Sequence, residues 1–89
     1  MTNIIIKQRE AEADAWIFAV ECAGVNYTIT APKEYWKKLT GGTIEPEEFV
    51  RKSFAFLLAR EPQKSILREF ALPVIQTYFP EYEAKITSQ

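Results

Sequence analysis

The stretch AWIFAVECAGVNYTIT, Ala15 to Thr30, determines the architecture of the N-terminal part of the chain. Apolar residues alternate with other residues on both sides of Ala23-Gly24, as they do in strands with one buried face. A two-residue turn at Ala23-Gly24, where Gly24 supplies a positive φ, would close these segments into a β-hairpin. Its predicted pairs share one apolar face: Cys22 with Val25, Val20 with Tyr27, and Phe18 with Ile29. A slip of one residue would place these side chains against polar partners, so the register is well specified.

The residues before the hairpin predict a third strand. Residues 3–9 (NIIIKQR) include three consecutive isoleucines, and β-branched residues favour strands. Residues 10–15 (EAEADA) are compatible either with a loop or with a polar extension of the strands. We favour a three-stranded antiparallel meander over residues 3–30.

In the rest of the chain, prolines and glycines lie at positions where helices typically begin and end. Pro32 suits the first turn of a short helix that ends at Gly41-Gly42. Pro46 suits the first position of a second helix, which should stop near Arg60 because Pro62 disfavours helical geometry at the preceding residue. Apolar residues cover about half of the circumference of this second helix or more, which predicts a central helix packed on two neighbours.

Two shorter helices are predicted after Pro62. Ser65 is a suitable N-cap for a helix over Ile66–Phe70, and Pro73 should begin a helix that Pro80 stops. Residues 81–89 are expected to form a polar, frayed tail, with Tyr82 and Ile86 docked on the core.

The predicted fold class is therefore α+β. An N-terminal antiparallel β-hairpin or three-stranded meander is followed by three to four helices packed on one sheet face. We expect one domain over residues 1–89, with strands in 3–30, helices in 32–80 and the tail in 81–89.

Composition restricts the classes of function. Eleven Lys and Arg residues stand against twelve Asp and Glu residues in a chain of 89, and the two signs are mixed along it. This balance argues against general binding to nucleic-acid backbones. The longest apolar run, from Phe54 to Ala59, is far shorter than the roughly 20 residues of a membrane span. With one cysteine, no internal disulfide and no evident secretory leader, the expected location is the cytoplasm.

The residue types that carry common catalytic chemistry are scarce. The chain contains no histidine, and one cysteine cannot build a thiolate cluster or a Cys-x-x-Cys pair. Cys22 is either an inert core residue or a reactive thiol. Glu45, Glu47 and Glu48 suit a helix N-terminus better than a metal or acid–base site. We expect no catalytic residues, metal or cofactor, and hence no enzyme.

The C-terminal stretch REPQKSILREFALPVIQTYFPEYE, residues 60–83, does not match a DNA-reading helix-turn-helix. Its last predicted helix offers only Gln76 and Thr77 as polar reading groups, and Glu81 and Glu83 add negative charge beside it. Nucleic acid is therefore the least favoured partner.

The aromatic residues Tyr78, Phe79 and Tyr82 allow two interpretations. They either cap the core of the chain, or part of the cluster stays exposed and binds another protein or a second copy of the chain in a homodimer. Arg60 and Arg68 would then contribute to the polar rim of that interface, although solvated ion pairs with neighbouring glutamates also explain them.

A ligand pocket between sheet and helices is the alternative hypothesis. Four aromatic side chains would line it: Trp16, Tyr27, Tyr35 and Trp36. Their polar atoms could orient an apolar or aromatic small molecule.

The segment from Tyr35 to Glu83 resembles a group of short, uncharacterised bacterial proteins. The similarity rests on the pattern YW..LTGG, FLLxREP, SIL and YFPEYE, of which FLLAREP and YFPEYE are the most distinctive parts here. The resemblance implies a bacterial cytoplasmic protein and supplies no functional residues. The composition and the aromatic cluster, rather than the resemblance, predict a non-enzymatic protein-interaction or regulatory module.

Overall fold

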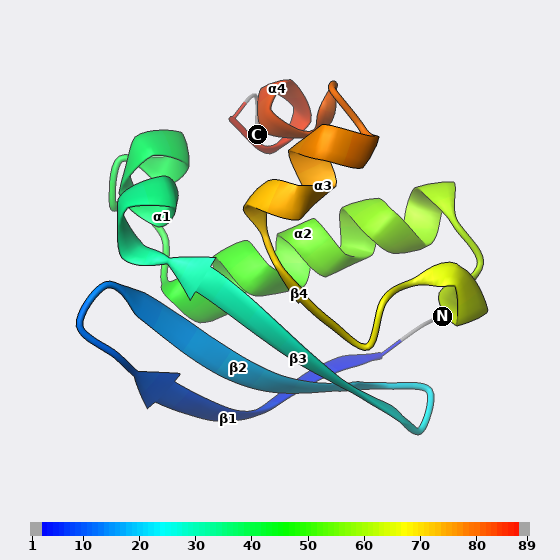
Figure 1. Cartoon of the computed structure of the whole chain (residues 1–89). Coiled ribbons are helices and arrows are strands. Elements are labelled where there is room, and N and C mark those ends of the chain that lie inside the picture. The colour runs from blue at the N-terminus through cyan, green and yellow to red at the C-terminus, as the bar shows by residue number, and fades with distance from the viewer. Residues whose placement is uncertain (1–2, 88–89) are drawn as a thin grey trace.

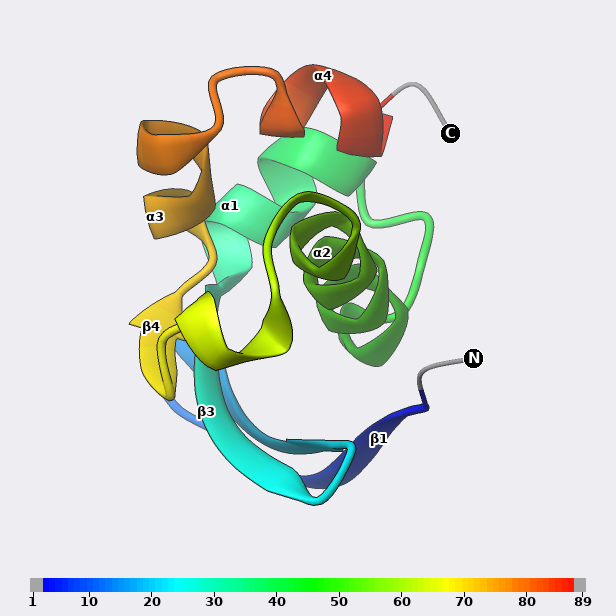
Figure 2. The ribbon, with the colours of Figure 1, turned by 90° about the vertical axis from the view of Figure 1, so that its right-hand side faces the viewer.

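A four-stranded sheet carries the helices on one of its faces (Figure 1), and a view turned by 90° shows the same arrangement (Figure 2). The computed structural model describes residues 3–87. Neighbouring strands follow the order β1-β2-β3-β4. The elements are β1 (Ile4–Ala11), β2 (Ala15–Cys22), β3 (Val25–Pro32), α1 (Lys33–Thr40), α2 (Pro46–Arg60), η1 (Gln63–Ser65), β4 (Glu69–Ala71), α3 (Pro73–Tyr78) and α4 (Tyr82–Thr87). The predicted α+β class is confirmed.

The hairpin has the predicted register. Cys22 pairs with Val25, Val20 with Tyr27, and Phe18 with Ile29. The turn residues Ala23 and Gly24 have φ values of 51° and 81°, as a two-residue type I′ turn requires. The apolar pairs of the sequence thus lie on one face of β2 and β3.

β1 completes the predicted antiparallel meander and extends further than residues 3–9. It pairs with β2 as far as Ala11 opposite Trp16, so the strands continue as a polar ribbon and residues 12–14 form the turn. The register shifts between Ile6 and Gln8, which marks a β-bulge at Lys7.

The two longer helices have nearly the predicted bounds. Pro32 is the N-cap of α1, with extended backbone angles, and so lies just outside the helix. Gly41 ends α1 with a left-handed φ of 67°. α2 begins at Pro46 and ends at Arg60, and Glu61 before Pro62 is extended.

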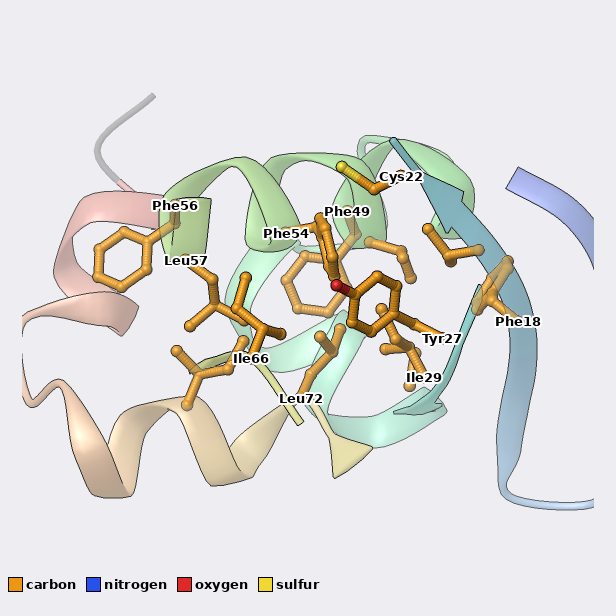
Figure 3. Close-up of a cluster of buried hydrophobic side chains, with 14 of the residues drawn as sticks. Phe18, Cys22, Tyr27, Ile29, Phe49, Phe54, Phe56, Leu57, Ile66 and Leu72 are labelled. Carbon is orange, nitrogen blue, oxygen red and sulfur yellow. The ribbon is translucent and has the colours of Figure 1, made fainter. Parts of the chain in front are cut away.

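α2 is the central helix of the fold. It packs against the sheet and also contacts α1 and α4, while only a narrow strip of the helix, which includes Arg51 and Ala55, is exposed. Figure 3 shows Phe49 and Phe54 of α2 beside Ile29 and Tyr27 of the sheet. Burying each such side chain contributes about 1.5–3 kcal/mol, so this layer contact supplies much of the stability.

The predicted helix over residues 66–70 is wrong. Gln63–Ser65 forms a short 3-10 turn, and Glu69–Ala71 forms β4, which pairs in parallel with β3. The N–H of Thr28 donates to the carbonyl of Arg68 at 2.8 Å, and the N–H of Leu72 donates to the carbonyl of Thr30 at 2.9 Å. Without β4, these groups of β3 would lie on an unpaired sheet edge, and this long-range pairing outweighs the helical spacing of Ile66 and Phe70. The part assigned to helices, residues 32–80, therefore contains a strand.

The predicted frayed tail is also wrong for the described residues of that segment. α4 packs against α1, α2 and α3. Tyr82 is fully buried and Ile86 packs on the core, so their predicted docking is confirmed. This docking provides the partners that hold α4 as a helix. Residues 88–89 lie outside the described part of the chain.

Candidate functional site

An apolar groove opens between the C-terminal end of α2, the segment that leads into β4, and α3. Its volume is about 210 Å³. The apolar part of its lining includes Leu57, Ile66, Leu67, Phe70, Val74 and Tyr78. These residues come from three separate elements and from the connection after α2, so only the folded chain assembles the groove.

Exposed apolar side chains gather at this groove. Ile5, Leu67 and Tyr78 are the large hydrophobic residues that are exposed within the described part of the chain. Leu67 is 53% exposed and Tyr78 is 65% exposed, and both line the groove. A single exposed hydrophobic residue is ordinary, whereas two beside an apolar hollow are typical of an interaction site.

The local sequence explains how the groove forms. Pro62 ends α2. The N–H of Ile66 then donates to the carbonyl of Gln63 at 3.1 Å and closes a turn. Ile66 is buried while the next residue, Leu67, is exposed, as expected where successive extended residues face opposite sides. Pro73 then begins α3, whose last residue, Tyr78, lies over the groove.

Glu61 is the charged residue of the lining. Its backbone N–H donates to the carbonyl of Leu57 at 2.9 Å and so caps α2. Within residues 3–87 its carboxylate forms no ion pair. The groove therefore combines an apolar floor with one negative charge that lacks a cationic partner in the described chain.

The structure separates the three aromatic residues predicted to act together. Tyr82 is buried, and its hydroxyl lies 2.6 Å from the Ser53 hydroxyl, so it belongs to the core. Phe79 is half-buried, with its ring centroid 6.0 Å from that of Phe56. Tyr78 is the exposed member. The core interpretation holds for Tyr82, whereas Tyr78 remains available for a partner.

The two predicted rim arginines do not line the groove. The guanidinium of Arg60 lies 3.7 Å from the centre of the Phe56 ring and its Nε lies 3.0 Å from Oε2 of Glu81. Arg60 lines a second cavity, of about 360 Å³, with Lys52, Lys85 and Ile86 among its neighbours. Arg68 is exposed on the connection to β4.

The four residues of the predicted ligand pocket are not brought together. Trp16 and Trp36 contact each other edge to face, with ring centroids 5.1 Å apart. Tyr27 is buried against Phe54 on the part of the hairpin near its turn, about four residues along the strands from Trp16, or roughly 13 Å. The Tyr35 hydroxyl donates to Glu83 at 2.9 Å. None of the four lines either cavity described above.

None of the ionisable groups with shifted pKa values lines the groove. Burial raises the pKa of Tyr82 and outweighs the lowering effect of its hydrogen bond with Ser53, while the charge of Glu83 adds to the rise. Burial and the hydrogen bond to Glu83 raise the pKa of Tyr35, and burial raises that of the Cys22 thiol. The hydrogen bond from Arg60 holds the pKa of Glu81 below its usual range. In residues 3–87, no group of three or more His, Cys, Asp or Glu residues is placed to hold a metal ion.

Sequence reasoning named Tyr78 and Phe79 but missed the other residues of the groove, notably Leu67, Phe70 and Val74. The helix predicted over residues 66–70 places Phe70 in the wrong element, so its position beside α3 could not be recognised from the sequence. A usable signal was Leu67, because an apolar residue directly after the apolar Ile66 does not fit the alternation of a strand with one buried face.

No family model, curated protein or solved structure matches the chain. None of the helices among the described residues has the length and apolar character needed to cross a membrane.

Proposed function

We propose that this protein is a non-enzymatic protein-interaction module that binds a partner through the groove between α2, β4 and α3. The observation that carries the proposal is the position of Leu67 and Tyr78, two of the most exposed large hydrophobic residues, at one apolar hollow. Tyrosine is a frequent anchor residue in interfaces because its ring buries a large apolar area and its hydroxyl can remain hydrated.

The size of the groove supports a protein partner rather than a free small molecule. Its volume of about 210 Å³ lies below the roughly 300–1,000 Å³ of typical ligand pockets. A partner can place one anchoring side chain in such a hollow and make its other contacts on the surrounding surface.

We further propose that the protein acts in the bacterial cytoplasm, as a regulator or adaptor. With a single cysteine, Cys22, the chain cannot form an internal disulfide, which supports a reducing compartment. A second copy of the chain is the other candidate partner, and light scattering at increasing concentration would reveal a homodimer.

Comparative affinity capture from the native host tests the proposal. The baits are the tagged wild-type chain, Tyr78→Ala and Ile5→Ala, because Ile5 is exposed on β1 to 46% and serves as a matched control. We expect at least one partner to be recovered with the wild type and Ile5→Ala and lost more than tenfold with Tyr78→Ala. Equal recovery with all three baits, or recovery of no partner, would contradict the proposal.

A further inference from the structure

We propose that the groove takes an extended peptide segment, which adds to the sheet as a fifth strand along the free edge of β4. This inference rests on the proposed function and specifies the form of the partner. In such strand addition, backbone hydrogen bonds supply affinity and alternate side chains supply specificity.

The backbone of β4 has the hydrogen-bonding groups that strand addition needs. Arg68 and Leu72 bond to β3, so even-numbered residues direct their backbone groups toward β3. Neighbouring residues of a strand direct these groups to opposite sides. The N–H and C=O groups of Glu69 and Ala71 consequently point away from the sheet.

The outer edge of β4 is accessible. The sheet order ends at β4, and among the described residues no further strand pairs with it. The principal contacts of β4 are with β3 and α3. In Figure 2, β4 lies at the outer margin of the sheet below α3, with no ribbon beyond it.

The groove lies on the correct face for side chains of an added strand. Phe70 pairs with Ile29, whose side chain faces the helices, and Phe70 lines the groove. Every second residue of an added strand would face the same way, toward the space that Leu67, Val74 and Tyr78 border. A dry cavity of about 150 Å³ can hold benzene, so about 210 Å³ is suitable for one large apolar side chain.

Size and charge favour a short segment with a positive charge over a second folded copy. A standard protein interface uses about 20–30 residues on each side, whereas β4 has three residues, of which two face outward. Glu61 provides a carboxylate without an ion-pair partner in the described chain. A lysine or arginine beside the apolar anchor of the peptide would complement it.

The opposite edge of the sheet lacks these features. β1 is eight residues long, but a bulge at Lys7 interrupts its register. Lys7 pairs with Glu21 at 3.3 Å and Arg9 pairs with Glu47 at 3.0 Å. Bulges and charged side chains are devices that discourage pairing at sheet edges. The three residues of β4 also limit pairing, because short edge strands are another such device, so the added strand would pair over only a few residues. Strand addition is expected at β4, where the described residues form no bulge and no ion pair.

Peptide selection tests the inference on the full-length protein. A displayed library of random decapeptides is selected against the immobilised chain, and the enriched peptides are synthesised. We expect peptides with alternating apolar residues and a basic residue, whose binding weakens more than tenfold with Tyr78→Ala. N-methylation at alternate backbone positions should abolish binding, while N-methylation at the intervening positions should have little effect.

A pair of protein variants tests the same edge of β4 by changing the protein instead of the peptide. Glu69→Pro removes one outward N–H and leaves the bonds to β3 in place, because prolines are tolerated at edge positions where the N–H faces solvent. Glu69→Ala keeps that N–H and is the matched control. We expect at least tenfold weaker peptide binding for Glu69→Pro and near wild-type binding for Glu69→Ala. If Glu69→Pro does not fold, the N-methylated peptides decide the question.

The possible results separate the two proposals. Failure to select any peptide that depends on Tyr78 would overturn the proposed function together with this inference. Peptides that need Tyr78 but bind as helices, insensitive to the pattern of N-methylation, would overturn strand addition and leave the proposed function standing. A dimer of the chain that Glu69→Pro disrupts would overturn the inference in favour of a second copy.

Discussion

Tyr78 and Tyr82 are four residues apart and have opposite environments. Tyr82 is fully buried at the start of α4, with its ring edge-on to Phe56 at a centroid distance of 5.2 Å. Tyr78 is 65% exposed at the end of α3, over the groove. Pro80 separates the two short helices, so the chain changes direction between the two rings. The same residue type therefore serves stability in one place and is available for binding in the other.

The hydroxyl groups show the same difference. The Ser53 hydroxyl lies 2.8 Å from the carbonyl oxygen of Phe49 and 2.6 Å from the hydroxyl of Tyr82, with which it shares a hydrogen bond. These contacts give the hydroxyls of Ser53 and Tyr82 hydrogen-bond partners inside the core. For the partly exposed Tyr78, water is the available partner. Removing the ring of Tyr82 should therefore lower the stability of the fold, whereas removing the ring of Tyr78 should weaken partner binding.

The largest expected effect is the loss of stability in Tyr82→Ala. Removing a buried aromatic ring costs about 3–5 kcal/mol, a large fraction of the roughly 5–15 kcal/mol that stabilises a typical domain. Urea unfolding followed by circular dichroism measures the change. Tyr78→Ala is the control and should remain within about 0.5 kcal/mol of the wild type. Equal losses in the two variants would contradict the contrast between them.

Ser53→Ala should have the next largest effect. It leaves the Tyr82 hydroxyl buried without a partner, at a cost of about 1–3 kcal/mol. Adding Tyr82→Phe removes that unpaired hydroxyl, so the double variant should lose less stability than the sum of the two single variants. Additive losses in urea unfolding would show that the two groups are not coupled.

Alkaline pH should destabilise the protein through the buried tyrosine. Burial raises the pKa of Tyr82 above the value of about 10 for an exposed phenol. The folded state then retains a proton that the unfolded state releases, so stability present below pH about 10 is lost as pH rises toward the pKa of the folded state. The contribution is about 1.4 kcal/mol per pH unit. Tyr35, whose pKa is also raised, acts in the same direction.

Tyr82→Phe should reduce this alkaline slope, because it removes the buried phenol whose pKa is raised. Urea midpoints measured between pH 9 and pH 11 give the slopes. An equal slope in the wild type and in Tyr82→Phe would show that the phenol of Tyr82 does not contribute.

The smallest effect is expected at the connection between the two tyrosines. The hydrogen bond from Arg60 holds the pKa of Glu81 below its usual range. Arg60→Met should return the Glu81 pKa toward the ordinary value, as measured by carboxyl chemical shifts during an acid titration. Lys52→Met, which removes a nearby cation that does not bond to Glu81, is the control and should change the pKa less.

Local patterns accounted for the hairpin and α2. The alternation around Gly24 and the prolines at 46 and 62 operate over a few residues, so their consequences are visible in the sequence. β4 was missed because a three-residue strand has almost no pattern of its own, and the unpaired edge of β3 that stabilises it is distant in the chain. Local propensity could not outweigh this tertiary pairing.

The candidate site was predicted only in part for a similar reason. Tyr78 and Tyr82 occur in one short aromatic stretch, and their sequence neighbourhood does not separate them. Ser53 separates them in the structure, because the buried hydroxyl of Tyr82 needs a hydrogen-bond partner and Ser53 on the apolar face of α2 supplies it. The exposure of Leu67 likewise depends on the course of the chain after Pro62, which only the folded structure defines.

The pairing of Thr28 with Glu69 has a kinetic consequence. The β2–β3 hairpin closes locally and can form within about 1–10 μs. β4 can join it only after a loop of roughly forty residues has closed, and contacts of such sequence separation are typical of slow steps in folding. The groove needs β4 in place, so it should be among the last features to appear during folding. A partner that binds the groove would then bind the fully folded protein and not chains in which only the hairpin has formed.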